Sequence, residues 1–418
     1  MKHLISCAAL LLLLLSTSAA AQRRVIWQHG LGGSDEFWEE FANQFQRERR
    51  LTSTRISANT SAGVRTMAAD IVAQTRGVAA PQTIAIGHSM GGVAFREIAA
   101  RTAPAHVGGL VTVGSPLSGA RIADRLQDGG VTNYIEHGVG ELLKGPRRSI
   151  GILGIVTLGA VELLNGRQLQ EILLNKTGVD ERIMSLASGP SISDLAENGA
   201  YMRQARAYSV NLPRVSIYGN ESSPVHYRLA SSFSGHPDSH YPGIVNIAEG
   251  FYAARSITSF FGIFGPIVGA YKAAGWRAGR DYLRNGSEAG WNTLIGANRT
   301  ESYRSCTQVL TCDPNFYWPV CVYGNPTPDQ LATCRSCYRE ECRTITRSVN
   351  EPSDGLLYVS TQTGSDRAAL PSSWRANATL ECEFTNHSEF KDHANSEQAL
   401  NDVFDTRRGV PRFFSTPR

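Results

Sequence analysis

Short apolar runs and longer amphipathic segments alternate along the first 120 residues of the chain. Apolar runs predict strands at residues 25–28, 83–86 and 109–113, and the short segment 53–57 is the second predicted strand in chain order. Between them, apolar residues recur at helical spacing, which predicts helices over residues 35–50, 62–76 and 93–100. Strands that alternate with helices indicate an α/β protein with a parallel sheet and helices on both of its faces.

This alternation is interrupted twice before the chain ends. It stops after residue 120, resumes with a strand at 215–218, and stops again near residue 222. Two late apolar runs, at 356–359 and 379–384, predict the last strands. We therefore expect a sheet built from both ends of the chain, with these divisions: core 22–120, insertion 121–212, core strand 213–221, insertion 222–350 and core 351–418.

Each insertion contains an apolar stretch that glycines interrupt, at residues 150–164 and 257–271. Either stretch could be a mobile lid that opens at a lipid surface over an acyl-binding groove. Either could equally be a buried helix over a large core. The residue pattern does not separate these two interpretations.

The chain begins with the pattern of an export signal over residues 1–21. Lys2 precedes an apolar stretch at residues 8–15, and Ala19 to Ala21 form a small-residue cleavage site. We expect cleavage after Ala21 and a secreted or periplasmic protein. After residue 22 no apolar run reaches the ~20 residues of a membrane helix, and the formal net charge of +4 gives no indication of a nucleic-acid partner. We expect the mature protein to be soluble or peripheral.

Cysteines are concentrated in one segment of the second insertion. Six of them lie within residues 306–342: Cys306, Cys312, Cys321, Cys334, Cys337 and Cys342. In an exported chain this density favours disulfides over a zinc or redox role for the Cys334-x-x-Cys337 pair. Cys382 makes the number of mature cysteines odd. It is either unpaired and buried, or bonded into the cluster while another thiol stays free.

The segment Gly87-His88-Ser89-Met90-Gly91 places a serine between glycines, after a predicted strand and before a predicted helix. Glycines remove the side chains that would collide at a sharp strand-to-helix elbow. We therefore expect Ser89 to be a nucleophile. The backbone N–H groups of Met90 and of Leu31, in the glycine-rich loop after the first strand, are the predicted oxyanion donors.

A serine nucleophile needs a base, and the base needs an acid that holds it in the right tautomer. His387 is the predicted base because it directly follows the last strand; we expect His393 to be a solvated helix residue instead. Asp354, in an Asp-Gly turn 33 residues earlier, is the preferred acid. Glu221 is the alternative acid, because it directly follows the strand at 215–218.

These motifs resemble those of α/β-hydrolase-fold lipases, most closely the secreted bacterial triacylglycerol lipases. The matching segments are residues 25–33, 87–92, 114–116, 353–355 and 386–387. The resemblance implies an α/β-hydrolase fold. The two large insertions, expected to form a lid or cap, and the disulfide-rich segment are features of this chain, and the cysteine segment has no counterpart in the family pattern. It also implies that Asp354 is the acid and His387 the base. It covers residues 24–120 and 350–390 well and the insertions poorly.

The calcium site of those lipases cannot be carried over to this chain, because Ser388-Glu389-Phe390 follows His387 where the lipases carry a calcium-site aspartate, and the sequence leaves calcium binding open. His236 and His240 do not suggest a metal site, since Pro237 favours a loop there. We therefore predict no cofactor and assign no metal-binding residue.

Together these features predict a secreted serine hydrolase that cleaves carboxylic esters. We expect its substrates to be lipid or acyl esters, met as small molecules or through transient contact with a lipid surface. An acyltransferase, thioesterase or amidase would use the same three residues. A hydrolase-like binding module without activity is a further alternative. The sequence does not define the oligomeric state.

Overall fold

The computed structural model describes residues 22–150, 189–221, 250, 253–254, 256, 266–310, 327–328, 338–365 and 375–417. Some features predicted from the sequence lie outside these residues: the leader 1–21, nearly all of the apolar stretch 150–164, the first part of 257–271, the His236–His240 segment, Cys312, Cys321, Cys334 and Cys337. The chain divides into two compact units, residues 298–350 and the remainder, and each is described by itself.

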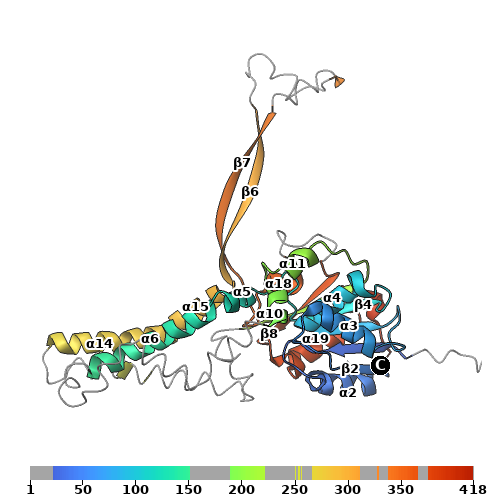
Figure 1. Cartoon of the computed structure of the whole chain (residues 1–418), viewed down its shortest axis with the longest axis horizontal. Helices are drawn as coiled ribbons and strands as arrows, with labels where there is room; N and C mark the ends of the chain where they lie inside the picture. Colours follow the sequence, from blue (N-terminus) through green and yellow to red (C-terminus); the bar gives the residue numbers. More distant parts are fainter. Residues whose placement is uncertain are drawn as a thin grey trace, which may run out of the picture. The chain divides into compact units, whose positions relative to one another are not determined.

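A six-stranded sheet forms the core of the larger unit (Figure 1). Its strand order is β2-β1-β3-β4-β5-β8, and every neighbouring pair is parallel. The strands are β1 (Arg24–Gln28), β2 (Thr52–Ile56), β3 (Ile84–His88), β4 (Gly109–Val113), β5 (Arg214–Asn220) and β8 (Ala378–Glu383). The predicted parallel sheet, with strands from both ends of the chain, is confirmed.

Helices make up most of the other described residues of this unit. The α-helices are α2 (Glu39–Glu48), α3 (Val64–Gln74), α4 (Met90–Glu97), α5 (Arg121–Gln127), α6 (Gly130–Ile150), α10 (Pro190–Leu195), α11 (Ala200–Ala205), α14 (Pro266–Asp281), α15 (Ser287–Leu294), α18 (Val359–Thr363) and α19 (Ala394–Phe404). Short 3-10 or π segments are η1 (Asp35–Trp38), η2 (Ile98–Thr102), η3 (Tyr282–Gly286), η5 (Glu389–Lys391) and η6 (Arg412–Phe414). Within the described ranges, no helix combines the length and the hydropathy needed to cross a membrane.

The two faces of the sheet carry separate hydrophobic cores because successive strand residues point to opposite sides. Ile26 of β1 packs in the core that α3 and α4 cover. Its neighbour Trp27 packs in the other core, with aromatic side chains of α2 and α19. The same alternation occurs in β3 and β4. Helices therefore cover both faces, as the sequence predicted.

Helices from the two predicted insertions pack against each other. α6 comes from the first insertion, α14 and α15 come from the second, and α6 contacts both; Figure 1 shows α6 and α14 side by side. Tyr134 of α6 donates a hydrogen bond to the Ser287 carbonyl at 2.7 Å and its ring lies 5.6 Å from that of Trp291. Trp291 in turn donates to the Gly355 carbonyl at 2.7 Å. This contact connects the insertion helices to the turn that carries Asp354.

The prediction of a strand at residues 356–359 is wrong. Residues 356 and 357 lie in a bend, and Val359 begins α18. The Asp354 carboxylate accepts hydrogen bonds from the N–H groups of Leu356 and Leu357 at 3.0 and 2.7 Å. These N–H groups are therefore not available for a strand ladder, and β8 occupies the place beside β5.

The smaller unit is a two-stranded antiparallel ribbon of β6 (Asn298–Leu310) and β7 (Tyr338–Asn350). The sequence did not predict these strands, because polar residues occupy both faces and hide the alternation that marks a half-buried strand. An isolated two-stranded ribbon is only marginally stable in water. Cys306 and Cys342 lie directly opposite each other and form a disulfide, which closes a long loop and so stabilises the ribbon.

The remaining described cysteine, Cys382 of β8, is unpaired and buried, which is the first of the two alternatives left by the sequence. Its Sγ lies 3.5 Å from the Asn395 carbonyl oxygen of α19. Burial raises the pKa of this thiol to about 12. A thiol with that pKa is protonated and unreactive at neutral pH.

Candidate active site

Ser89 occupies a sharp elbow between β3 and α4. Its backbone has φ 50° and ψ −124°, a conformation that side-chain-bearing residues rarely adopt. The flanking glycines make the elbow possible: a methyl group on Gly87 would lie 2.5 Å from the Gly91 carbonyl carbon, and one on Gly91 would lie 2.6 Å from the His29 carbonyl oxygen. The sequence therefore places Ser89 where its hydroxyl is presented at the carboxyl end of a central strand.

His387 lies in the loop after β8, and its ring meets the Ser89 hydroxyl. His387 Nε2 is 3.0 Å from Ser89 Oγ, and both side chains are buried. The distance is within the range of a hydrogen bond to an imidazole nitrogen. The predicted nucleophile and base, which are 298 residues apart in the chain, are thus neighbours in the fold.

Asp354 holds the other side of the imidazole. Its Oδ2 is 2.7 Å from His387 Nδ1, and the side chain is fully buried. Because a carboxylate only accepts hydrogen bonds, Nδ1 carries the hydrogen and Nε2 presents its lone pair to Ser89. The His387 N–H also donates to the Asp354 carbonyl at 2.8 Å, so Asp354 holds both the ring and the backbone of His387.

Glu221, the alternative acid, lies just beyond the carboxyl end of β5 and is buried. Its N–H donates to the Ser353 carbonyl at 2.7 Å, so it borders the turn that carries Asp354. Since His387 Nδ1 has a single hydrogen and this hydrogen is bonded to Asp354, the structure brings Asp354, rather than Glu221, to that nitrogen.

The segments that carry the predicted oxyanion donors lie beside Ser89. Met90 is the first residue of α4, so its N–H has no acceptor in the preceding turn of that helix. The loop that contains Leu31 adjoins Ser89: a methyl group on Gly30 would lie 2.7 Å from Ser89 Cβ and 3.3 Å from Oγ. Gly32 N–H donates to Thr60 Oγ1 at 3.0 Å, which fixes this loop against the residues after β2. Met90 and the loop that contains Leu31 therefore border the Ser89 side chain, and their N–H groups remain the predicted donors to a tetrahedral oxyanion.

The sequence did not indicate the role of Gln362, a fully buried residue of α18. Its side chain accepts from the Gly219 N–H at 2.9 Å and donates to the Leu357 carbonyl at 2.9 Å. It thus ties the end of β5 to the turn that carries Asp354. No sequence signature marks this role. Both partners of the Gln362 side chain are backbone groups, which every residue carries.

His393 differs from its prediction as a solvated helix residue. It is a half-buried N-cap of α19, and its Nδ1 accepts from the Asn395 N–H at 3.2 Å. The cap satisfies one of the N–H groups that every helix start leaves open. This role keeps His393 at the start of α19, whereas His387 contacts Ser89.

The residues described offer no metal centre beside Ser89. In these parts of the chain, one group of possible ligands, Cys306, Glu340 and Cys342, has ligand atoms close together, and its two sulfurs already form the disulfide. No step of the chemistry considered below uses a metal ion.

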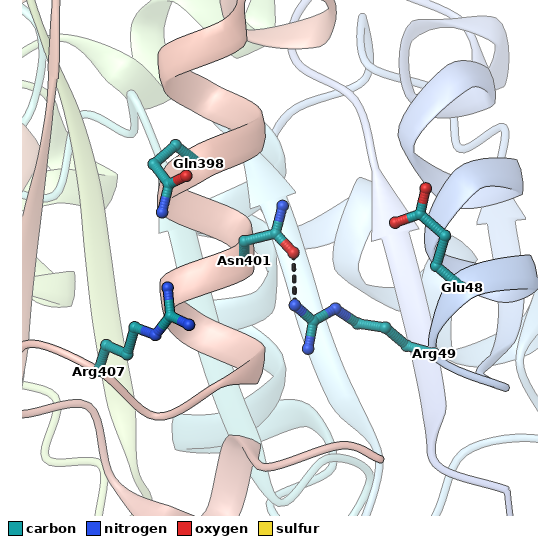
Figure 2. Close-up of a pocket in the computed structure, with 5 residues that line it drawn as sticks. All are labelled: Glu48, Arg49, Gln398, Asn401 and Arg407. Carbon is teal, nitrogen blue, oxygen red and sulfur yellow. Dashed lines mark hydrogen bonds between the residues drawn. The ribbon is translucent and has the colours of Figure 1, made fainter. Parts of the chain in front are cut away.

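A separate polar cavity of about 300 Å³ lies between the end of α2 and α19. Figure 2 shows the residues that line it: Glu48, Arg49, Gln398, Asn401 and Arg407. Arg49 forms an ion pair with Asp405 at 2.6 Å and a hydrogen bond with Asn401, and Arg407 pairs with Asp405 at 3.2 Å. Both guanidinium groups are neutralised by protein carboxylates, so we assign no ligand to this cavity.

A parallel sheet with a strained serine elbow after a central strand is the arrangement of the α/β-hydrolase fold, and the predicted fold class is therefore confirmed. No family model matches the sequence, and no curated protein matches it.

Several solved structures match with low identity. An extracellular α/β-hydrolase from a Paenibacillus species is 14% identical over 47% of this chain and 77% of its own, with a TM-score of 0.27. The mature Bacillus licheniformis lipase BlEst2 is 13% identical over 53% and 77%, with a TM-score of 0.32. A gene product of Listeria innocua is 12% identical over 91% and 93%, with a TM-score of 0.34. We assign this chain no role on the basis of these matches.

Proposed function

We propose that this protein is a serine hydrolase of carboxylic esters. The observation that carries the proposal is the chain of hydrogen bonds from Ser89 Oγ to His387 Nε2 and from His387 Nδ1 to Asp354 Oδ2, at 3.0 and 2.7 Å. It supports nucleophilic acyl transfer because a serine hydroxyl becomes a good nucleophile only when a positioned base removes its proton.

In the proposed reaction, Ser89 Oγ attacks the ester carbonyl carbon while its proton passes to His387 Nε2. Asp354 stabilises the resulting imidazolium, and the Met90 and Leu31 N–H groups stabilise the oxyanion. The tetrahedral intermediate collapses, the bond to the alcohol oxygen breaks, and Nε2 protonates that oxygen. Water then attacks the acyl-enzyme with His387 again as base, and the acid is released as Ser89 regains its proton.

Lipid or acyl esters are the proposed substrate class, and the support for this finer assignment is the motif resemblance to lipases at Ser89, Asp354 and His387. We also propose that the protein is exported. The disulfide between Cys306 and Cys342 supports this location, because structural disulfides persist mainly in oxidising compartments.

A fluorophosphonate probe tests the proposal directly, because it phosphonylates a serine only where a base activates it. We expect wild-type protein to be labelled and to hydrolyse p-nitrophenyl esters, and Ser89→Ala to do neither. Ser115→Ala is the matched control: it removes a nearby buried hydroxyl, which lies 3.3 Å from the Gly87 carbonyl, and it should leave labelling intact. A folded wild-type protein that is neither labelled nor active would contradict the proposal and favour a binding module.

A second measurement identifies which molecule accepts the acyl group, water or an alcohol, and which acyl-chain length is preferred. Rates on esters and thioesters of increasing chain length, with and without an added alcohol, separate hydrolysis from acyl transfer and from thioester cleavage. A rate that rises steeply above the solubility limit of a short-chain triglyceride would support a lipase. A rate that saturates below that limit would instead support an esterase that acts on dissolved substrate.

A further inference from the structure

His88, the residue directly before Ser89, contacts the backbone of the proposed base. It is the last residue of β3, is 5% exposed, and its Nε2 lies 2.9 Å from the His387 carbonyl oxygen. Because a carbonyl oxygen only accepts hydrogen bonds, Nε2 carries the hydrogen and donates it. The two residues are 299 positions apart in the chain, so this bond joins the elbow to the loop after β8.

Aromatic contacts hold the His88 ring in this orientation. Phe37 stacks on it with a centroid distance of 4.3 Å, and Phe390 lies 5.8 Å away on another side. The His387 ring itself lies 4.8 Å from it. A buried ring packed on several sides cannot turn to another partner without opening the core.

The second ring nitrogen shows that His88 is a neutral imidazole. In the described part of the chain, Nδ1 is buried and has no hydrogen-bond partner, which suits a lone pair and not a proton. Burial lowers the pKa of His88 well below its usual value, and the neighbouring His387 and His29 add to this effect, while the bond to the His387 carbonyl opposes it. A neutral ring at this place does not repel the imidazolium that His387 would form.

Both backbone polar groups of His387 are thus bound to neighbours of the reacting residues. Its N–H donates to the Asp354 carbonyl at 2.8 Å, and its carbonyl accepts from His88 at 2.9 Å. His387 has no regular element of its own, since it lies between the end of β8 and η5. These two bonds therefore supply the support that a strand or helix would otherwise give.

We infer that His88 is a positioning residue, whose Nε2–H holds the His387 backbone so that the base stays within hydrogen-bond distance of Ser89. The inference rests on the proposed function. It assigns His88 no contact with substrate. A displacement of about 1 Å at a reacting group can reduce the rate about a hundredfold, so loss of this bond should lower kcat more than it changes KM.

A pair of amide variants tests the inference. His88→Gln places an N–H donor near the position of Nε2, whereas His88→Asn carries the same amide on a side chain one methylene shorter, which reaches only the position of Nδ1. We expect His88→Asn to lower kcat roughly ten- to hundredfold with a KM within about twofold of wild type. We expect His88→Gln to recover most of that loss. Fluorophosphonate labelling rates should follow the same order.

The controls separate the possible outcomes. Circular dichroism and thermal unfolding select a temperature at which both variants are folded. A third variant, His88→Phe, keeps an aromatic ring at this position but has no hydrogen-bond donor, so it should behave as His88→Asn. Equal kcat for the Gln and Asn variants, or a loss that appears in thermal stability alone, would overturn the inference. An inactive and unlabelled wild-type protein would instead count against the proposed function, so the two failures are distinguishable.

Discussion

At the residue scale, the site depends on backbone groups as much as on side chains. Ser89 adopts a strained conformation that only the glycines around it permit. Asp354 accepts from two N–H groups in its own turn while it bonds to His387, so its direction is determined locally. The carboxylate is therefore held in place before any substrate binds, which lowers the reorganisation that a charged intermediate would require.

The first prediction concerns the acid. Asp354→Asn should lower kcat about 10⁴-fold, because an amide can donate to Nδ1 and so favours the tautomer that turns an N–H toward Ser89. Glu221→Gln, the matched control at the neighbouring buried acid, should change kcat by less than about tenfold. Steady-state kinetics on a p-nitrophenyl ester provide the measurement. Loss of turnover in the Glu221 variant alone would show that the acid is misassigned.

At the element scale, β8 and α19 connect the core to the base. β8 pairs with β5, and α19 packs on β8 through the same hydrophobic core that contains Cys382. The loop between them carries His387. Strand pairing therefore determines where this loop leaves the sheet, and the packing of α19 determines where it returns.

The second prediction tests this packing through Cys382, whose pKa burial raises from the usual 9.0 to about 12. Between these values the unfolded thiol loses its proton while the folded thiol keeps it, so rising pH stabilises the unfolded chain. The contribution of the protonated, buried thiol to the stability of the folded protein is fully present below pH 9.0. It is lost as the pH rises toward about 12. From pH 8.5 to 10.5, the free energy of unfolding of wild type should fall by about 2 kcal/mol more than that of Cys382→Ala.

Urea unfolding at pH 8.5 and 10.5, on wild type and Cys382→Ala in parallel, measures this difference. The other groups that titrate in this range are common to both proteins and cancel in the comparison. An identical fall in the free energy of unfolding for the two proteins would mean that the thiol titrates normally and that the β8–α19 core admits water.

At the scale of the whole molecule, the ribbon of β6 and β7 is a separate unit inserted into the larger one. The two positions at which the chain leaves and re-enters the larger unit are close together, since Glu351 N–H donates to the Ala297 carbonyl at 3.0 Å. An insertion whose ends are hydrogen-bonded to each other places little constraint on the fold that carries it.

The third prediction follows from those adjoining ends. Replacement of residues 299–349 by a short Gly-Ser linker should leave the larger unit folded, with a cooperative thermal transition and Ser89 still labelled by a fluorophosphonate. Extension of the deletion through α15, to residues 287–349, should abolish labelling, because Trp291 of α15 bonds to the turn of Asp354. A ribbon deletion that prevents folding would show that the units are interdependent.

Much of the fold and of the candidate site could be predicted because the signals are local. The strands β1, β3 and β4 are largely apolar runs, and the Ser89 elbow is marked by glycines that a strained backbone requires. The ribbon could not be predicted, since a strand exposed on both faces has no hydrophobic periodicity to detect. The strand expected at 356–359 failed for a different reason: Asp354 captures the N–H groups that a ladder would have used.

The sequence by itself determined the parallel sheet, the elbow at Ser89 and the short set of residues that could serve it. Hydrophobic periodicity and the placement of glycines involve residues that are close in the chain, so they can be recognised from the sequence without knowledge of the tertiary structure. Only the tertiary structure decided that Asp354 rather than Glu221 meets His387 Nδ1, and that His88 binds the backbone of His387. These choices are contacts between segments up to 299 residues apart, and the way the strands pair and the helices pack determines which of the candidate groups come within bonding distance.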